Sequence, residues 1–230
     1  MLILEGIIGD CKAENGACTI ENSVNMGSVT FRGDVSGNHD YLLLGGIAGY
    51  LYSYKYDSTL KNCANYGDVT DSGESKDSYV GGIVGESYSS SSSNRVYIYN
   101  CLNHGTITHN GTTVYELCLG GIAGCTYYTI IENCVSGGNI SLLTKSYYNY
   151  IGSIIGSASS DTSISNCYFT SDLGNYNKYG YAYSTPSVSN TLSYDNITFE
   201  LSETVSAWGY IGTSLIGALN AAADFLLLPP

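Results

Sequence analysis

Charged residues are scarce in this sequence, at 12% of 230 residues, which is about half the share in an average globular protein. Only 8 are basic against 20 acidic ones, and the formal net charge is −12. Binding to a phosphate backbone needs clustered lysine and arginine, so this composition excludes nucleic acid as a partner. No apolar run of about 18 residues occurs, and we predict no membrane insertion. The hydrophobic content of 43% is still enough to bury a core.

Residue patterns typical of catalytic and metal sites are missing as well. The sequence has no Cys-x-x-Cys pair of the kind found in zinc sites, and arginine occurs only as Arg32 and Arg95. Asp68 and Asp71 are close in sequence, but no second repeat places a carboxylate there to make the pair that glycoside hydrolysis requires. We expect the histidines at the surface or in turns; they are His39, His104 and His109. The sequence therefore predicts no enzyme, no cofactor and no metal site.

What the sequence has instead is an internal repeat. Five segments open on a glycine-rich block: EGIIG at 5–9, GGIAG at 45–49, GGIVG at 81–85, GGIAG at 120–124 and GSIIG at 152–156. A variable stretch follows each block, and then an aliphatic residue two places before an asparagine. These asparagines are Asn22, Asn62, Asn100, Asn133 and Asn166, at intervals of 40, 38, 33 and 33 residues.

The composition of the repeat favours strands over helices. Thr, Val, Ile, Tyr and Ser dominate it, and glycine falls every few positions. Short apolar patches between Gly, Asn and Ser turns are typical of strands. We therefore predict an all-β fold for residues 1–171, a right-handed parallel β-helix (solenoid) of about five coils with roughly three short strands per coil.

Alignment of the repeats predicts rows of equivalent side chains along the solenoid. Three aliphatic rows should point inward: Ile20, Leu60, Ile98, Ile131 and Ile164; Ile7, Ile47, Ile83, Ile122 and Ile154; and Val29, Val69, Ile107 and Ile140. The repeated asparagines should form a further row at a coil corner, because stacked amides can hydrogen-bond along a column. The paired glycines suit corners where φ is positive or where backbones crowd.

The two ends of the chain depart from the repeat. Residues 172–230 form a Tyr/Ser/Asn-rich C-terminal segment, in which Ser214 can N-cap a short helix over 215–226. We expect this helix to cap the last coil, because an open coil is an unpaired edge. Neither a cap nor a signal peptide precedes the first repeat, so we expect either a natural N-terminus further upstream or end-to-end association.

Tyrosine is the residue type that best suggests a function. The stretches 50–59, 71–78 and 86–97 vary between repeats and are predicted to be loops, where solenoids usually bind. Tyrosine has a flat apolar face with a hydroxyl and loses little entropy when fixed, so it favours binding surfaces. The alternating tyrosines would share one face of an extended stretch, although rings that only cover strand edges would look the same. The candidate binding residues are Tyr50, Tyr52, Tyr54, Tyr56, Tyr127 and Tyr128.

The glycine blocks, followed by N-C-x-N-x-G-x-[VI]-[TS], resemble the GLUG repeat over about residues 5–171. Isoleucine replaces the leucine of that motif here, and the fifth copy carries Ser153 in place of a glycine. Proteins with such repeats are typically large surface or secreted proteins of bacteria and some parasitic protists, including adhesin-like proteins. The resemblance implies a β-solenoid and an extracellular location, and it brings no catalytic residues.

Cysteines and glycosylation triplets fit that location. Cys11/Cys18 and Cys118/Cys125 are two pairs with the same spacing, and both are candidate disulfides of an oxidising compartment. A packing row of buried thiols is favoured for the repeated cysteines, and vertical disulfides are the alternative; they are Cys63, Cys101, Cys134 and Cys167. The candidate glycosylation sites are Asn110, Asn139 and Asn196.

Taken together, these features predict a non-catalytic extracellular or cell-surface protein. Its function would be adhesion, with Tyr/Asn/Ser-rich loops presented to glycan or protein ligands. Two alternatives stay open at this point. One is a structural subunit that assembles end to end into a filament or surface layer, and the other is a β-helix enzyme that processes polysaccharides.

Overall fold

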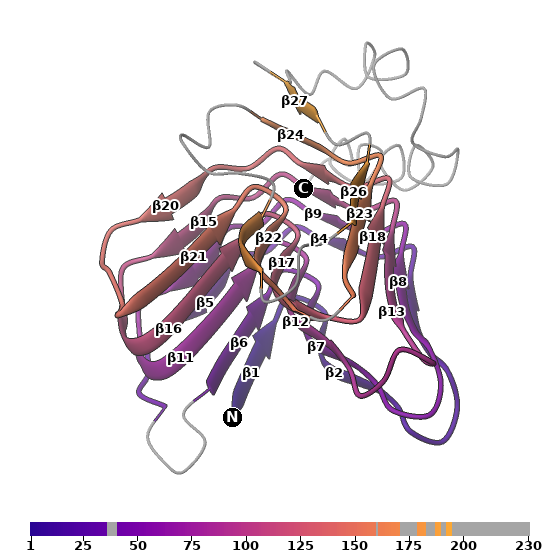
Figure 1. Cartoon of the computed structure of the whole chain (residues 1–230). Coiled ribbons are helices and arrows are strands. Elements are labelled where there is room, and N and C mark those ends of the chain that lie inside the picture. The colour runs from indigo at the N-terminus through magenta and orange to yellow at the C-terminus, as the bar shows by residue number, and fades with distance from the viewer. Residues whose placement is uncertain (36–40, 160, 171–178, 183–186, 190–191, 195–230) are drawn as a thin grey trace, which may run out of the picture.

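A computed structural model describes residues 1–35, 41–159, 161–170, 179–182, 187–189 and 192–194. Every regular element in this part is a β-strand, and all pairing between these strands is parallel. Figure 1 shows the strands stacked turn upon turn, with equivalent strands of successive repeats side by side. The predicted all-β parallel solenoid is therefore confirmed; its hand stays a prediction.

The strands form five sheets. Sheet 1 contains β1 (Leu2–Glu5), β6 (Tyr41–Gly45), β11 (Glu74–Gly81), β16 (Thr112–Gly120) and β21 (Tyr148–Gly152). Sheet 2 contains β2 (Ile8–Ala13), β7 (Ala48–Ser53), β12 (Val84–Ser89), β17 (Ala123–Tyr127), β22 (Ile155–Ser159) and β25 (Tyr179–Ala182). Sheet 3 contains β3 (Cys18–Glu21), β8 (Ser58–Lys61), β13 (Val96–Tyr99), β18 (Thr129–Glu132), β23 (Ser163–Ser165) and β26 (Ser187–Ser189). Sheet 4 contains β4 (Val24–Asn25), β9 (Ala64–Asn65), β14 (Leu102–Asn103), β19 (Val135–Ser136), β24 (Tyr168–Thr170) and β27 (Leu192–Tyr194). Sheet 5 contains β5 (Val29–Phe31), β10 (Val69–Asp71), β15 (Ile107–His109) and β20 (Ile140–Leu142).

Each complete turn therefore has five strands, and the turns β1–β5 to β16–β20 make four complete turns. The described part of the following turn, β21–β24, has no strand in sheet 5. The prediction of three strands per coil was too low for a physical reason. Two of the stretches predicted to be loops are largely strands, because they continue the parallel pairing of sheets 1 and 2.

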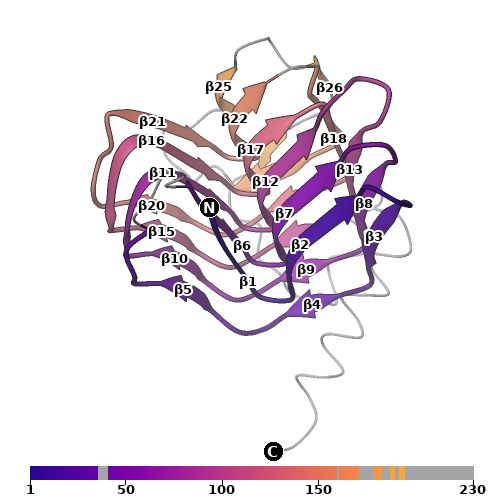
Figure 2. The same ribbon diagram turned by 90° about the horizontal axis from the view of Figure 1, so that it is seen from below.

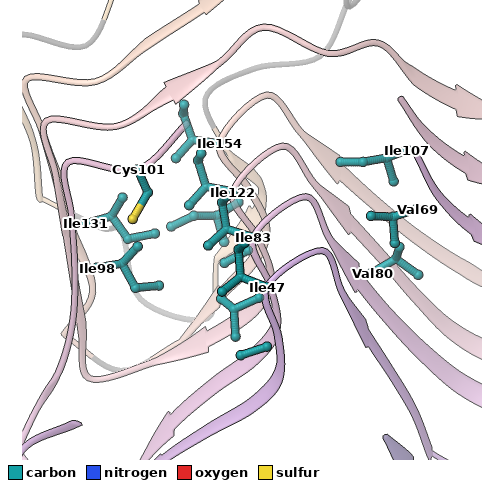
Figure 3. Packing of buried hydrophobic residues seen from close by; sticks show 14 of the residues in the cluster. Ile47, Val69, Val80, Ile83, Ile98, Cys101, Ile107, Ile122, Ile131 and Ile154 are labelled. Carbon is teal, nitrogen blue, oxygen red and sulfur yellow. The ribbon is translucent and has the colours of Figure 1, made fainter. Parts of the chain in front are cut away.

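The interior of the solenoid is filled by the predicted aliphatic rows (Figure 3). Ile47, Ile83, Ile122 and Ile154 lie one above another and are fully buried. Burying each such side chain contributes roughly 1.5–3 kcal/mol. Ile7, predicted to belong to this row, is instead 40% exposed, because the first turn is covered by a neighbour on one side only.

The repeated asparagines form the predicted corner between sheets 3 and 4. All five have a positive φ, from 50° to 56°, a conformation that asparagine tolerates better than most residues. Asn62 Nδ2 donates to Asn22 Oδ1 at 3.2 Å, and Asn100 Nδ2 donates to Asn62 Oδ1 at 3.1 Å. The corner is therefore held by both backbone conformation and an amide ladder.

The glycine pairs that join sheet 1 to sheet 2 serve close packing. A Cβ on Gly82 would lie 2.2 Å from Asn103 Cγ and 2.3 Å from the carbonyl oxygen of Gly121. A positive φ, the other predicted reason for these glycines, is not found in them. The space is filled by a second, buried asparagine row, in which Asn65 Nδ2 donates to Asn103 Oδ1 at 2.9 Å.

Two predictions about the C-terminal segment fall outside the described residues. They are the capping helix over 215–226 and the glycosylation triplet at Asn196. The described part of the chain contains no helix long and apolar enough to cross a membrane.

Candidate functional site

Three tyrosines stack on the outer face of sheet 2. Tyr52, Tyr88 and Tyr127 occupy one register position on β7, β12 and β17, and we call them the tyrosine column. Their ring centroids lie 5.7 Å apart between Tyr52 and Tyr88 and 5.1 Å apart between Tyr88 and Tyr127. All three are half-buried, so part of each ring faces solvent. Figure 2 shows the strands that carry them side by side.

Half of the six candidate tyrosines lie on strands rather than in loops: Tyr50, Tyr52 and Tyr127. Tyr50 and Tyr52 share the outer face of β7, as the alternation predicts, and their rings stack at 5.8 Å. Tyr54 stacks on Tyr52 at 6.1 Å from the turn after the strand. Tyr56 and Tyr128 also lie in turns, and within the described residues no ring contact joins them to the tyrosine column. Tyr88 was not predicted, although each column member follows the second glycine of its repeat by the same number of residues.

Beside the column, the outer faces of sheets 1 and 2 pack against each other. The two sheets spread apart from the glycine pairs that join them (Figure 1). Side chains from both fill the angle and form a second apolar cluster, separate from the interior, which we call the external cluster. Its buried members are Leu43, Tyr79, Cys118 and Cys125, with Ile3, Tyr50, Tyr127 and Tyr150 partly buried around them.

Three acidic side chains belong to this angle. Glu86 lies on the outer face of β12, two residues before Tyr88, while Asp77 and Glu116 are register partners on β11 and β16. Burial and the negative charge of Glu116 raise the pKa of Glu86 to about 7. Burial also raises the pKa of Glu116, and the negative charge of Asp77 raises it further. A hydrogen bond of 3.3 Å from Cys118 Sγ acts in the opposite direction and lowers the pKa of Glu116. These carboxyl groups were not predicted, because they come from different repeats and different strand positions.

The cysteines are divided between one disulfide and buried thiols. Cys11 and Cys18 are bonded across the turn between β2 and β3, with Cα atoms 6.0 Å apart. Cys118 and Cys125, the other predicted pair, are separate buried thiols in the external cluster. The repeated cysteines are buried free thiols, as a packing row requires. Burial raises the pKa of Cys101, Cys134 and Cys167, which keeps these thiols protonated.

His109 does not lie at the surface, contrary to the sequence prediction. It occupies an inward position of sheet 5 next to Asp71, and both side chains are fully buried. Its Nδ1 is 2.9 Å from Asp71 Oδ2, which also accepts a hydrogen bond of 2.7 Å from Ser78 Oγ. The three residue types are those of a hydrolase triad, but the serine contacts the aspartate rather than the histidine, and none of the three reaches solvent. The group is a structural element of the core.

Two of the predicted glycosylation sites are exposed. Asn110 follows β15 at a turn, and Asn139 precedes β20. Both side chains are accessible in the solenoid.

The comparisons with known proteins agree with this architecture. The GLUG motif matches the chain twice, at residues 115–141 and 147–174, which confirms the resemblance seen in the repeats. The fold is similar to the crystal structure of a Bacteroides ovatus protein that is provisionally described as an immunoglobulin A1 protease. That likeness has a TM-score of 0.50 and 20% sequence identity, and it covers 89% of this chain and 68% of the other. At this identity it shows a shared solenoid fold and no shared activity. A search of curated proteins found no match.

Proposed function

We propose that the chain is a non-catalytic extracellular binding module that takes a glycan along the tyrosine column. The observation that carries the proposal is the register of Tyr52, Tyr88 and Tyr127 on three successive turns. Adjacent strands are about 4.8 Å apart, so the column offers one aromatic face per turn along the solenoid axis. Such a row suits a linear chain of sugar rings, whose apolar faces stack on tyrosine while their hydroxyls bind its phenol groups.

An extracellular location is supported by two features. The Cys11–Cys18 disulfide is typical of an oxidising compartment. GLUG repeats, matched here at two places, are typical of surface and secreted proteins. Attachment of a cell surface to a glycan-bearing partner would be the resulting biological function.

A panel of immobilised glycans tests the proposal. We expect the wild-type protein to bind a subset of them, and the Tyr52→Ala/Tyr88→Ala variant to lose at least about tenfold in affinity, because two stacking faces are removed. The matched control is Tyr97→Ala/Tyr99→Ala, which removes two half-buried tyrosines from the outer face of sheet 3. Equal loss in both variants, or retention of binding without the column, would refute the proposal. Release of reducing ends from the panel would favour a polysaccharide-processing enzyme instead.

End-to-end assembly is a second candidate, favoured by the first turn. Strands β1–β5 are the end members of all five sheets, and several apolar side chains of this turn are exposed: Leu2, Ile7, Ile8 and Met26. Light scattering that shows rods lengthening with protein concentration would support this candidate, and a monomer near 24.5 kDa at all concentrations would exclude it.

A further inference from the structure

The carboxylate of Glu86 lies beside the tyrosine column, and no residue of the described part of the chain pairs with it. Glu86 and Tyr88 share the outer face of β12, and the charge of Glu116 reaches Glu86 from β16. Among the described residues, no hydrogen bond or ion pair is made by the Glu86 carboxylate, and the ion pairs of this part lie elsewhere. Lys12, the basic residue in register with Tyr52, is paired with Asp10 at 2.8 Å. The described chain therefore supplies no cation to this group.

The hydroxyl of Tyr79 points to the same place. Tyr79 is only 7% exposed and belongs to the external cluster, where it faces Cys118, Cys125, Glu116 and Glu86. No hydrogen bond to its hydroxyl is made within the described part of the chain. A hydroxyl without a partner in this part of the chain can hydrogen-bond to a ligand.

The chemistry of this group selects a positively charged ligand. Glu86 and Glu116 are partly buried, and the negative charge of Glu116 acts on Glu86, so ionisation of Glu86 is disfavoured. A bound cation between the two carboxyl groups would favour their ionised forms. The faces of Tyr50 and Tyr52 add an attraction for an ammonium group. An anionic ligand would be repelled, and a neutral one would leave the carboxylates uncompensated.

We propose that Glu86, Glu116 and Tyr79 form a subsite for the ammonium group of an amino sugar whose chain lies along the tyrosine column. This inference rests on the proposed function, because the column has to stack sugar rings for their amino groups to reach the subsite. Glu86 and Glu116 would accept hydrogen bonds from the ammonium group, and Tyr79 would accept a further one through its hydroxyl oxygen.

The contribution of Glu86 to binding of an ammonium group should weaken in acid. Lowering the pH through about 7 protonates Glu86, whose pKa is raised to that value, and so removes one of the two negative charges. Other titratable groups lie around Glu86 on the strands packed against it. They are Asp10 and Lys12 on β2, Tyr41 on β6, Tyr50 and Tyr52 on β7, Lys76, Asp77 and Tyr79 on β11, Tyr88 on β12, Glu116 and Cys118 on β16, and Cys125 and Tyr127 on β17. Comparison of the wild-type protein with the Glu86→Gln variant separates the part of the pH dependence that Glu86 causes from the part that the other groups cause.

Titration calorimetry with two matched probes tests the inference. The probes are a glucosamine tetramer, which carries ammonium groups, and an N-acetylglucosamine tetramer, which does not. We expect the wild-type protein at pH 7 to prefer the glucosamine tetramer by about tenfold or more, the difference made by one hydrogen bond to a charged group. Glu86→Gln should abolish the preference and flatten its dependence on pH, and the control Glu132→Gln, on sheet 3, should leave both unchanged.

The outcomes separate this inference from the proposed function. Equal binding of both tetramers that depends on Tyr52 and Tyr88 would overturn the ammonium subsite and keep the glycan-binding column. A preference for the glucosamine tetramer that Glu86→Gln abolishes, but that survives loss of the tyrosines, would support an ammonium site at Glu86 and overturn both the column and the placement of the sugar chain along it. Failure of both tetramers to bind would overturn the subsite, and the glycan panel would then decide the proposed function.

Discussion

Replacement of His109 by leucine should destabilise the solenoid strongly, although it makes the core more apolar. Leucine already occupies this register position in the next turn, as Leu142, so the side chain fits the row. Asp71 would keep hydrogen bonds from Ser78 Oγ at 2.7 Å and from the Gly73 amide at 3.1 Å, but its buried carboxylate would lose the imidazole at 2.9 Å. Breaking a buried pair from one side costs about 3–5 kcal/mol, because the remaining polar group stays buried without its partner.

Removing both partners should restore much of that loss. Replacement of a buried pair by apolar residues is often neutral or stabilising. The free energy of unfolding of Asp71→Leu/His109→Leu should therefore be about 2 kcal/mol or more higher than that of His109→Leu. The Ser78 hydroxyl then lacks its acceptor, which limits the recovery. Urea unfolding followed by circular dichroism gives the midpoint and slope for each variant. A His109→Leu cost below about 1 kcal/mol, or a double variant equal to the sum of the singles, would refute the reasoning.

Two further predictions concern the corner and the carboxyl group. Asn100→Ala should lower stability by about 2 kcal/mol, because alanine is strained at a φ of 50° and cannot bond to Asn62. Asn100→Gly should lose only the hydrogen bond to Asn62, because glycine adopts a positive φ without strain. A melting temperature of Asn100→Gly that is no higher than that of Asn100→Ala would show that the positive φ does not matter. Glu86 holds its proton more tightly when folded than when unfolded, so wild-type stability should fall as pH rises from 4.5 to about 7. Chemical unfolding measured across that pH range should show a smaller fall in the stability of Glu86→Gln than of the wild-type protein. Parallel curves of stability against pH for the two proteins would exclude Glu86 as the cause.

The repeat made the solenoid predictable. Ile47 and Ile83 occupy equivalent positions of neighbouring repeats, and in a parallel stack equivalence in sequence becomes adjacency in space. The same logic predicted the asparagine corner and the row of buried thiols. The prediction that Ile7 is buried was wrong, because the repeat pattern does not show that the first turn of the structure has a neighbouring turn on one side only.

The candidate site was less predictable, because its parts do not repeat. Tyr52 and Tyr127 were recognised from clusters of tyrosine, yet Tyr88 stands alone in its stretch of sequence. Glu86 and Glu116 come from adjacent repeats but from different sheets, and only the angle between sheets 1 and 2 brings them together. His109 looked isolated because its partner Asp71 lies one repeat earlier, at the same register position.

The in-register stacking also makes the turn a unit that can be copied. Each turn brings its own corner asparagine and its own inward aliphatic residues, and all pairing is between equivalent positions. A duplicated turn would thus meet matching neighbours above and below, and would lengthen the molecule by about 4.8 Å. A duplicate of the turn that carries Tyr88 would also extend the aromatic row by one ring. Growth by gene duplication can therefore change the number of equivalent surface positions without a new fold having to arise.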